Sequence, residues 1–224
     1  MSEFEPMRIT AQLGCGVVSD ATLPIDSILY YIAMRKAHGP QDATEPGGHS
    51  GTSPLKVSMP LKLINPGPKW YYAASFAQWS EPVAEMTDYW NKRFDQQYSD
   101  IVDFGGRRGK VLVEQGKYRA YHMPMFTRHA LTVTWYAVGN IEAITKLLRF
   151  MPYIGKKTAQ GEGEVLRWTV EKWPHDWSVL KDGKLIRAIP TDDNQNGFYC
   201  GFRPSYYMRS NMAYCYIPQN NDAS

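Results

Sequence analysis

The sequence has few of the residues that define several large classes of protein. Its 224 residues include only three cysteines, Cys15, Cys200 and Cys215, and no two of them form a C-x-x-C pair. Cysteines this few and this scattered exclude a disulfide framework and a cysteine-based zinc site. We therefore predict a protein of the reducing cytoplasm, without a metal or another cofactor.

Long apolar runs and strong net charge are also absent. No segment approaches the roughly 18 to 20 apolar residues of a membrane-spanning helix, and the first five residues are acidic, unlike a secretory leader, so we expect no membrane segment. The formal net charge is only +3, so a nucleic-acid site must come from local clusters of basic residues. Aromatic residues are plentiful instead, with 15 tyrosines and 7 tryptophans whose flat rings can stack on bases.

Hydrophobic periodicity predicts a simple order of strands and helices. Helices are expected from Pro24 to a stop at Gly39-Pro40, and from 141 to 151 after the cap residue Asn140. Strands are expected at 8–13, 132–138 and 165–170, with two shorter extended pieces before 132 that are broken at Gly116 and Pro124. Strand, helix, two strands, helix, strand is the ferredoxin-like (RRM-like) order, so we predict an α+β fold with a βαββαβ core.

Three regions are predicted to lie outside this core, within a single domain that spans residues 1–224. Residues 39–54 are rich in turn formers and predict a long loop. Val83, Met86, Trp90 and Phe94 recur at steps of three and four residues, which predicts an amphipathic helix over 80–97 in an insertion at 77–104. Residues 173–224 combine turn formers with aromatics and predict an irregular C-terminal extension.

A glycine-rich loop between the second helix and the last strand is the most informative motif. Residues 153–165 read YIGKKTAQGEGEV. A dinucleotide fingerprint needs its glycines between a strand and the following helix, and a P-loop needs glycine where Phe150 stands, so neither nucleotide motif fits. Bare backbone next to the ammonium groups of Lys156 and Lys157 suits a phosphodiester chain. The alternative is a tight connection whose lysines only keep it soluble.

The loop and its position resemble the RAMP superfamily of CRISPR-associated RNA-binding proteins, whose signature is a glycine-rich loop between a helix and a strand. Three further stretches are similar to one branch of it, the Cas-five-type subunit of type IV CRISPR effector complexes. They are LPIDSILY at 23–30, WYYAASF at 70–76, and RAIP at 187–190 followed by GFRPSYY at 201–207. The resemblance extends from about residue 8 to 218.

This resemblance implies a non-catalytic, RNA-binding subunit of a ribonucleoprotein complex for defence against viruses and plasmids. Such a subunit holds the 5′ handle of the CRISPR RNA (crRNA) and contacts a backbone subunit and a large-subunit-like protein. The glycines of the loop are then points of close backbone approach and its lysines are phosphate contacts. The loop residues predicted to bind RNA are Gly155, Lys156, Lys157, Thr158, Gln160, Gly161 and Gly163.

A second candidate surface is the basic region from residue 105 to 130. Six basic residues there face one acid, Glu114, so this region carries more net charge than the whole chain. Tyr118, Tyr121 and Phe126 are interleaved with them, a mixture suited to binding a single strand through phosphates and stacked bases. The alternative is that part of them cover solvated faces of strands. The basic residues are Arg107, Arg108, Lys110, Lys117, Arg119 and Arg128.

Two other functions stay open at this stage. Some RAMP proteins cut crRNA without metal by using a histidine base, and His38 or His49 could take that role. A protein-only scaffold explains the aromatic C-terminal region but gives the basic region no role. The sequence favours the non-catalytic RNA-binding subunit over both.

Overall fold

A four-stranded antiparallel sheet forms the centre of the computed structural model, which describes residues 4–20, 22–42, 57–103, 105, 109–114 and 118–218. The strand order is β5-β8-β1-β9. The strands are β1 (Glu5–Leu13), β5 (Gln78–Trp79), β8 (Thr132–Gly139) and β9 (Val165–Lys172). The three longest were predicted from periodicity at 8–13, 132–138 and 165–170, and the structure confirms them.

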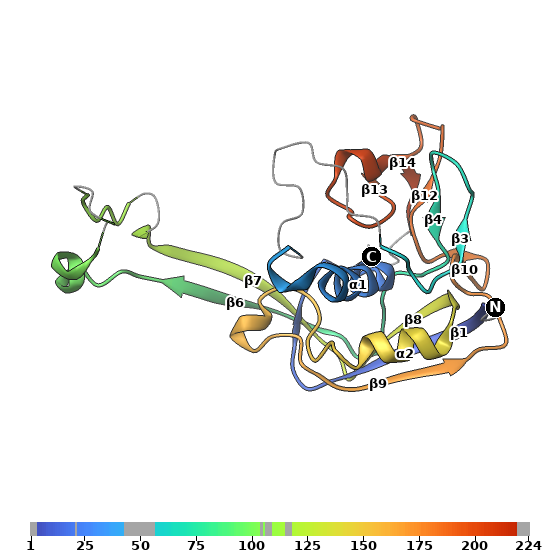
Figure 1. Ribbon diagram of the computed structural model, residues 1–224, viewed down its shortest axis with the longest axis horizontal. Helices are drawn as coiled ribbons and strands as arrows, with labels where there is room; N and C mark the ends of the chain where they lie inside the picture. The colour runs from blue at the N-terminus through green and yellow to red at the C-terminus, as the bar shows by residue number, and fades with distance from the viewer. Residues whose placement is uncertain are drawn as a thin grey trace.

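Two helices, α1 (Ile25–Asp42) and α2 (Ile141–Leu148), cover one face of this sheet (Figure 1). Alternate residues of β1, such as Ile9 and Ala11, are fully buried beneath them, as period-two patterning requires. The side-chain oxygen of Asn140 accepts a hydrogen bond from the backbone N–H of Ala143 at 2.7 Å, which confirms the predicted cap of α2. Helix packing thus turns the opposite face of the sheet away from the core.

The predicted end of the first helix was wrong. Helix α1 continues through Gly39 and Pro40 to Asp42. A proline removes one backbone hydrogen bond of a helix, and here it does so within the last turn, where little helix remains to be disrupted. The predicted loop at 39–54 therefore begins later, and its part from residue 43 onward lies outside the described residues.

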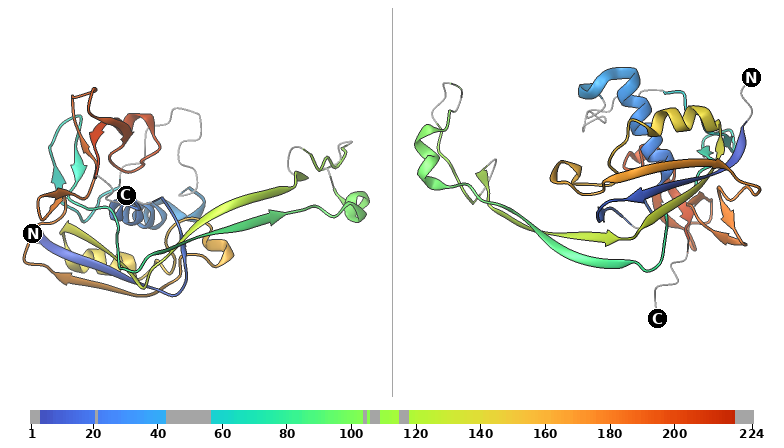
Figure 2. Two further views of the ribbon diagram at one scale, coloured as in Figure 1. Left: turned by 180° about the vertical axis from the view of Figure 1, so that it is seen from behind. Right: turned by 90° about the horizontal axis from the view of Figure 1, so that it is seen from below.

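A long antiparallel pair of strands extends from the body of the protein as an arm (Figures 1 and 2). Strand β6 (Ala84–Lys92) pairs with β7 (Tyr121–His129) along the full length of both, from Ala84 opposite His129 to Lys92 opposite Tyr121. At the root of the arm, β2 (Val17–Val18) pairs with the end of β7, and the 3-10 helix η1 (Gln96–Ile101) lies at the far end.

The arm corrects two predictions. In place of the amphipathic helix expected over 80–97, the insertion forms strand β6, because Thr87, Tyr89 and Trp90 favour a strand and β7 supplies the backbone partners. Most side chains of β6 are exposed, so the spacing of its apolar residues does not report a buried helical face. The break expected at Pro124 is also absent, because β7 pairs only with β6 at that point and a proline is tolerated where one edge of a strand is free.

The C-terminal extension contains short antiparallel strands rather than irregular chain alone. They form the sheet β12-β14-β13 and the pair β10-β11, and β3 with β4 makes a further pair from the middle of the chain. Their bounds are β3 Leu63–Ile64, β4 Tyr71–Tyr72, β10 Leu180–Lys181, β11 Lys184–Leu185, β12 Ile189–Pro190, β13 Phe198–Gly201 and β14 Met212–Tyr216, with the 3-10 helix η4 (Arg209–Asn211) before β14. These elements pack around a second small core that includes Phe76 and Phe202.

A buried arginine ties this extension to the body. The guanidinium of Arg187 donates hydrogen bonds to the carbonyl oxygens of Ala74, at 2.8 Å, and Phe202, at 2.7 Å. The hydroxyl of Tyr206 donates to the carboxylate of Asp26 at the start of α1, at 2.8 Å. Across the described residues, two α-helices and several antiparallel sheets make this an α+β chain, and none of those helices is long and apolar enough to cross a membrane.

Candidate nucleic-acid interface

The glycine-rich loop is closed at its base by backbone hydrogen bonds. The N–H of Ile154 donates to the carbonyl of Gly163 at 2.8 Å, and the N–H of Val165 donates to the carbonyl of Pro152 at 2.8 Å. The side chain of Ile154 is fully buried and anchors the loop in the main core. The loop is thus a fixed connection at the root of the arm (Figure 1).

The three glycines of the loop have different surroundings. All have positive φ, at +82° for Gly155, +93° for Gly161 and +76° for Gly163. A Cβ on Gly163 would lie 1.8 Å from the carbonyl oxygen of Ile154, and one on Gly155 would lie 2.7 Å from the carbonyl oxygen of Val18. A Cβ on Gly161 would meet nothing within 4 Å. Gly155 and Gly163 therefore allow close approach to the protein's own backbone, whereas the space beside the Cα of Gly161 is open.

Cys15 shapes the loop, and sequence reasoning missed it. Its thiol donates to the carbonyl oxygen of Gly161 at 3.1 Å and accepts from the N–H of Glu164 at 3.2 Å. These two contacts hold the open end of the loop against the turn that follows β1. The only signal in the sequence was the Gly14-Cys15-Gly16 turn, and nothing in that turn indicates which segment the thiol contacts.

The two loop lysines reach different partners. The ammonium of Lys156 is exposed and lies 3.1 Å from the carboxylate of Asp20, which is also exposed. Lys157 has a left-handed backbone, with φ of +63°, and its ammonium lies 4.4 Å from the centre of the Trp90 ring on the arm. Thr158 and Gln160 follow in the short 3-10 helix η3 (Thr158–Gln160), with Gln160 exposed. Lys157 therefore links the loop to the arm.

From this contact a row of rings and cations runs along one face of the arm. The rings of Trp90 and Tyr121 are stacked, with centroids 6.1 Å apart and planes at 18°. Nζ of Lys92 lies 5.9 Å and the guanidinium carbon of Arg119 lies 5.7 Å from the centre of the Tyr121 ring. We call Lys157, Trp90, Tyr121, Lys92 and Arg119 the cation–aromatic ladder. Asp88, two residues before Trp90, lies on the same side of β6 and nearer the body, and it carries a negative charge. On the arm, the ladder therefore begins at Trp90 and continues away from the body.

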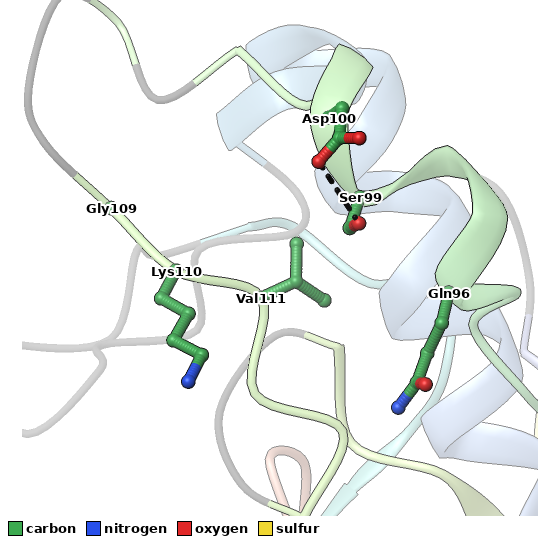
Figure 3. Close-up of a pocket in the computed structure, with 6 residues that line it drawn as sticks. All are labelled: Gln96, Ser99, Asp100, Gly109, Lys110 and Val111. Atoms are coloured by element: carbon green, nitrogen blue, oxygen red, sulfur yellow. Dashed lines mark hydrogen bonds between the residues drawn. The ribbon is translucent and has the colours of Figure 1, made fainter.

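Arg128 and Lys110, two further predicted basic residues, do not join the ladder. Nε of Arg128 donates to the carboxylate of Glu85 at 3.1 Å at the root of the arm, and its guanidinium lies over the Trp79 ring, which fits a structural role. Lys110 lies at the far end of the arm, where it lines a hollow of about 470 Å³ (Figure 3). Gln96, Ser99, Asp100, Gly109 and Val111 complete this lining. The predicted contacts Arg107, Arg108 and Lys117 lie outside the described residues.

The described histidines do not gather at one place, because His122 and His129 lie near opposite ends of β7 while His38 and His175 lie on other segments. Nδ1 of His122 is 2.6 Å from the side-chain oxygen of Asn91, and the His122 ring stacks on Tyr89 on the face of the arm opposite the ladder. His175 stacks on Trp177, and His38 is half-buried on α1. His49 lies outside the described residues. Among the residues that the structure describes, no three His, Cys, Asp or Glu side chains gather as a metal site would require.

Comparisons with known proteins identify the family. A chain in a cryo-EM structure of the type III-B Cmr-beta complex bound to cognate target RNA is similar over 76% of this chain, at 11% identity and a TM-score of 0.36, and the match spans 61% of that chain's own length. A likeness this weak carries no inference about function. No curated protein matches the sequence. The family model described as "CRISPR type IV associated protein Csf3" matches residues 5–218, which confirms the resemblance drawn from the sequence, and the chain belongs to this Csf3 family.

Proposed function

We propose that this chain, a subunit of a type IV CRISPR effector complex, binds the 5′ handle of crRNA and does not cut it. The observation that carries the proposal is the contact between Lys157 of the glycine-rich loop and Trp90 of the arm. It makes one continuous surface from two segments that are distant in the sequence. On this surface, cations flank a pair of stacked rings at both ends.

This combination of cations and aromatic rings matches the chemistry of single-stranded RNA. Successive phosphates need positive charge, and unpaired bases need flat faces, each worth about 1–3 kcal/mol when a base stacks on an aromatic side chain. The exposed ammonium of Lys156 and the open space beside Gly161 extend the same surface onto the loop. The ion pair between Lys156 and Asp20 is exposed, so a phosphate can replace the carboxylate at small cost.

The proposed scaffold for this surface is a ferredoxin-like core. The sheet order β5-β8-β1-β9, with α1 between β1 and β5 and α2 between β8 and β9, supports that assignment. The loop follows α2 and leads into β9, which is where the RAMP resemblance puts it. The arm is then an insertion between β5 and β8 that carries half of the proposed RNA surface.

The proposal is tested with purified protein and fluorescent crRNA in the presence of a metal chelator. We expect tight binding without cleavage, and weaker binding of an otherwise identical RNA that lacks the 5′ handle. Site-specific cleavage that disappears in His38→Ala or His49→Ala would instead support the processing nuclease. Equal affinity for RNA with and without the handle would contradict recognition of the handle, and no RNA affinity at all would leave a protein-only scaffold.

A further inference from the structure

Three tyrosines share the solvent face of the C-terminal sheet. Tyr199 of β13 lies directly opposite Tyr214 of β14, and Tyr216 follows two residues later on the same side. The exposed fractions of these side chains are 57%, 41% and 41%. The opposite side of the same strands, with Cys215, packs against the second core. Burial of the sheet therefore does not account for the three exposed rings, which we call the tyrosine face.

The tyrosine face differs in charge from the cation–aromatic ladder. The ring centroids of Tyr199 and Tyr214 are 5.5 Å apart at 69°, and the hydroxyl of Tyr216 donates to the carboxylate of Asp193 at 3.0 Å. Hydrogen bonds from Asn196 lower the pKa of Asp193 to about 2, so this carboxylate keeps its charge at neutral pH. The adjacent Asp192 has a side chain that is 99% exposed and forms an ion pair with Lys69. Of these two carboxylates, Asp193 is the one that contacts a ring of the tyrosine face, whereas cations contact the rings of the ladder.

These observations separate two kinds of ligand. An RNA backbone on the tyrosine face would bring phosphates close to the carboxylate of Asp193, which is repulsive. A protein surface with arginine or lysine has the complementary charge, and tyrosine supplies large contact area with few rotatable bonds. We propose that the tyrosine face docks a neighbouring protein subunit through a basic surface of that subunit. This proposal stands on residues that are separate from the RNA surface.

Site-specific crosslinking in the assembled complex tests the location. Benzoyl-phenylalanine replaces Tyr199 in cells that express all the type IV proteins with crRNA, and the complex is purified through a tag on another subunit. The matched control carries the same group at Phe150, which is 70% exposed at the end of α2. We expect a crosslink from position 199 to a lysine- or arginine-rich segment of another subunit. A crosslink only to RNA, only to a second copy of this chain, or no stronger than at position 150 would overturn the proposal.

Substitutions test the chemistry of the same face. Tyr199→Ser with Tyr214→Ser is expected to reduce the amount of this chain in the purified complex about tenfold or more, as loss of an interface hot spot does. Asp192→Lys is expected to reduce it as well, because it replaces the ion pair with Lys69 by two adjacent positive charges at the rim. The crRNA affinity of each isolated variant is expected to stay within about twofold of wild type, which also shows that the variant is folded. Wild-type retention of both variants in the complex would refute docking at this face, whatever the RNA affinity proves to be.

Discussion

The guanidinium of Arg187 lies 3.9 Å from the carboxylate of Asp26, and neither side chain is exposed to solvent. Arg187 belongs to the C-terminal extension, and Asp26 belongs to the first turn of α1. The pair therefore joins the two cores of the protein. Because each charge compensates the other away from water, removing one of them leaves a buried charge without its partner.

Arg187→Met is expected to destabilise the protein by about 3–5 kcal/mol near neutral pH, the usual cost of an unpaired buried charge. Urea unfolding followed by tryptophan fluorescence measures this change. The control is the double variant Asp26→Asn with Arg187→Met, which removes both charges and should recover part of the loss. A single variant within about 1 kcal/mol of wild type contradicts this account of the pair.

Stability should also depend on pH through Asp26. Burial raises the pKa of this carboxyl from 3.8 to about 6, although Arg187 and Tyr206 oppose the shift. A raised pKa in the folded state means that the contribution of Asp26 is most favourable below pH 3.8 and declines as the pH rises through about 6. As the pH rises from 3.8 to about 6, the free energy of unfolding of wild type should therefore fall relative to that of Asp26→Asn. Above about pH 6 the difference between the two proteins should stay constant. A rise in the relative stability of wild type over that pH range would contradict a raised pKa of Asp26. Asp193, with a pKa lowered to about 2, titrates below this window.

Two glycines of the loop should respond differently to alanine. Both have positive φ, which costs roughly 1–2 kcal/mol for alanine. At Gly163 the new Cβ would also collide with the carbonyl oxygen of Ile154, whereas at Gly161 it would meet open space. Overpacking adds about 1–3 kcal/mol, so Gly163→Ala should cost clearly more than Gly161→Ala in thermal unfolding. Equal costs would show that Gly163 is not packed as described.

How much of this structure could be predicted depends on where each signal lies in the chain. The periodicities of β1, β8 and α2 report burial against one core, so local sequence was sufficient to place these elements. The arm lacks such a signal, because most side chains of β6 are exposed. The strand that pairs with it, Tyr121–His129, is remote in the sequence, so the pattern at 80–97 was mistaken for a helix.

The residues of the candidate site also differ in whether the sequence alone could identify them. The glycine-rich loop is a contiguous motif, and its lysines could be found by inspection. Trp90 and Lys92 lie on the same side of β6, but they indicate a binding surface only when Lys157 and Tyr121 lie beside them. These two neighbours are remote in the sequence, so Trp90 and Lys92 were missed. The basic region was predicted as one surface, but Arg128 at the root of the arm pairs with Glu85, and Lys110 lies at its far end. The net charge of a sequence segment does not show where its charged side chains lie once the segment is folded.

Trp90→Ala should weaken binding of crRNA by about 5- to 150-fold, the range expected for the loss of one stacked base. It also removes the ring on which Lys157 rests. The matched control is Tyr89→Ala, the neighbouring residue on the opposite face of the arm, where its ring stacks on His122. Fluorescence anisotropy of both variants checks the result. Equal losses for the two substitutions would show that the face of the arm is irrelevant to binding.

The salt dependence of crRNA affinity tests the central claim most directly. Each lysine that contacts a phosphate of a single strand adds about 0.7 to the slope of log affinity against log salt. The double variant Lys156→Ala with Lys157→Ala should therefore reduce the slope by about 1.4, while the control Lys146→Ala, an exposed lysine of α2, should leave it unchanged. An unchanged slope in the double variant would contradict the claim that the glycine-rich loop binds the RNA backbone.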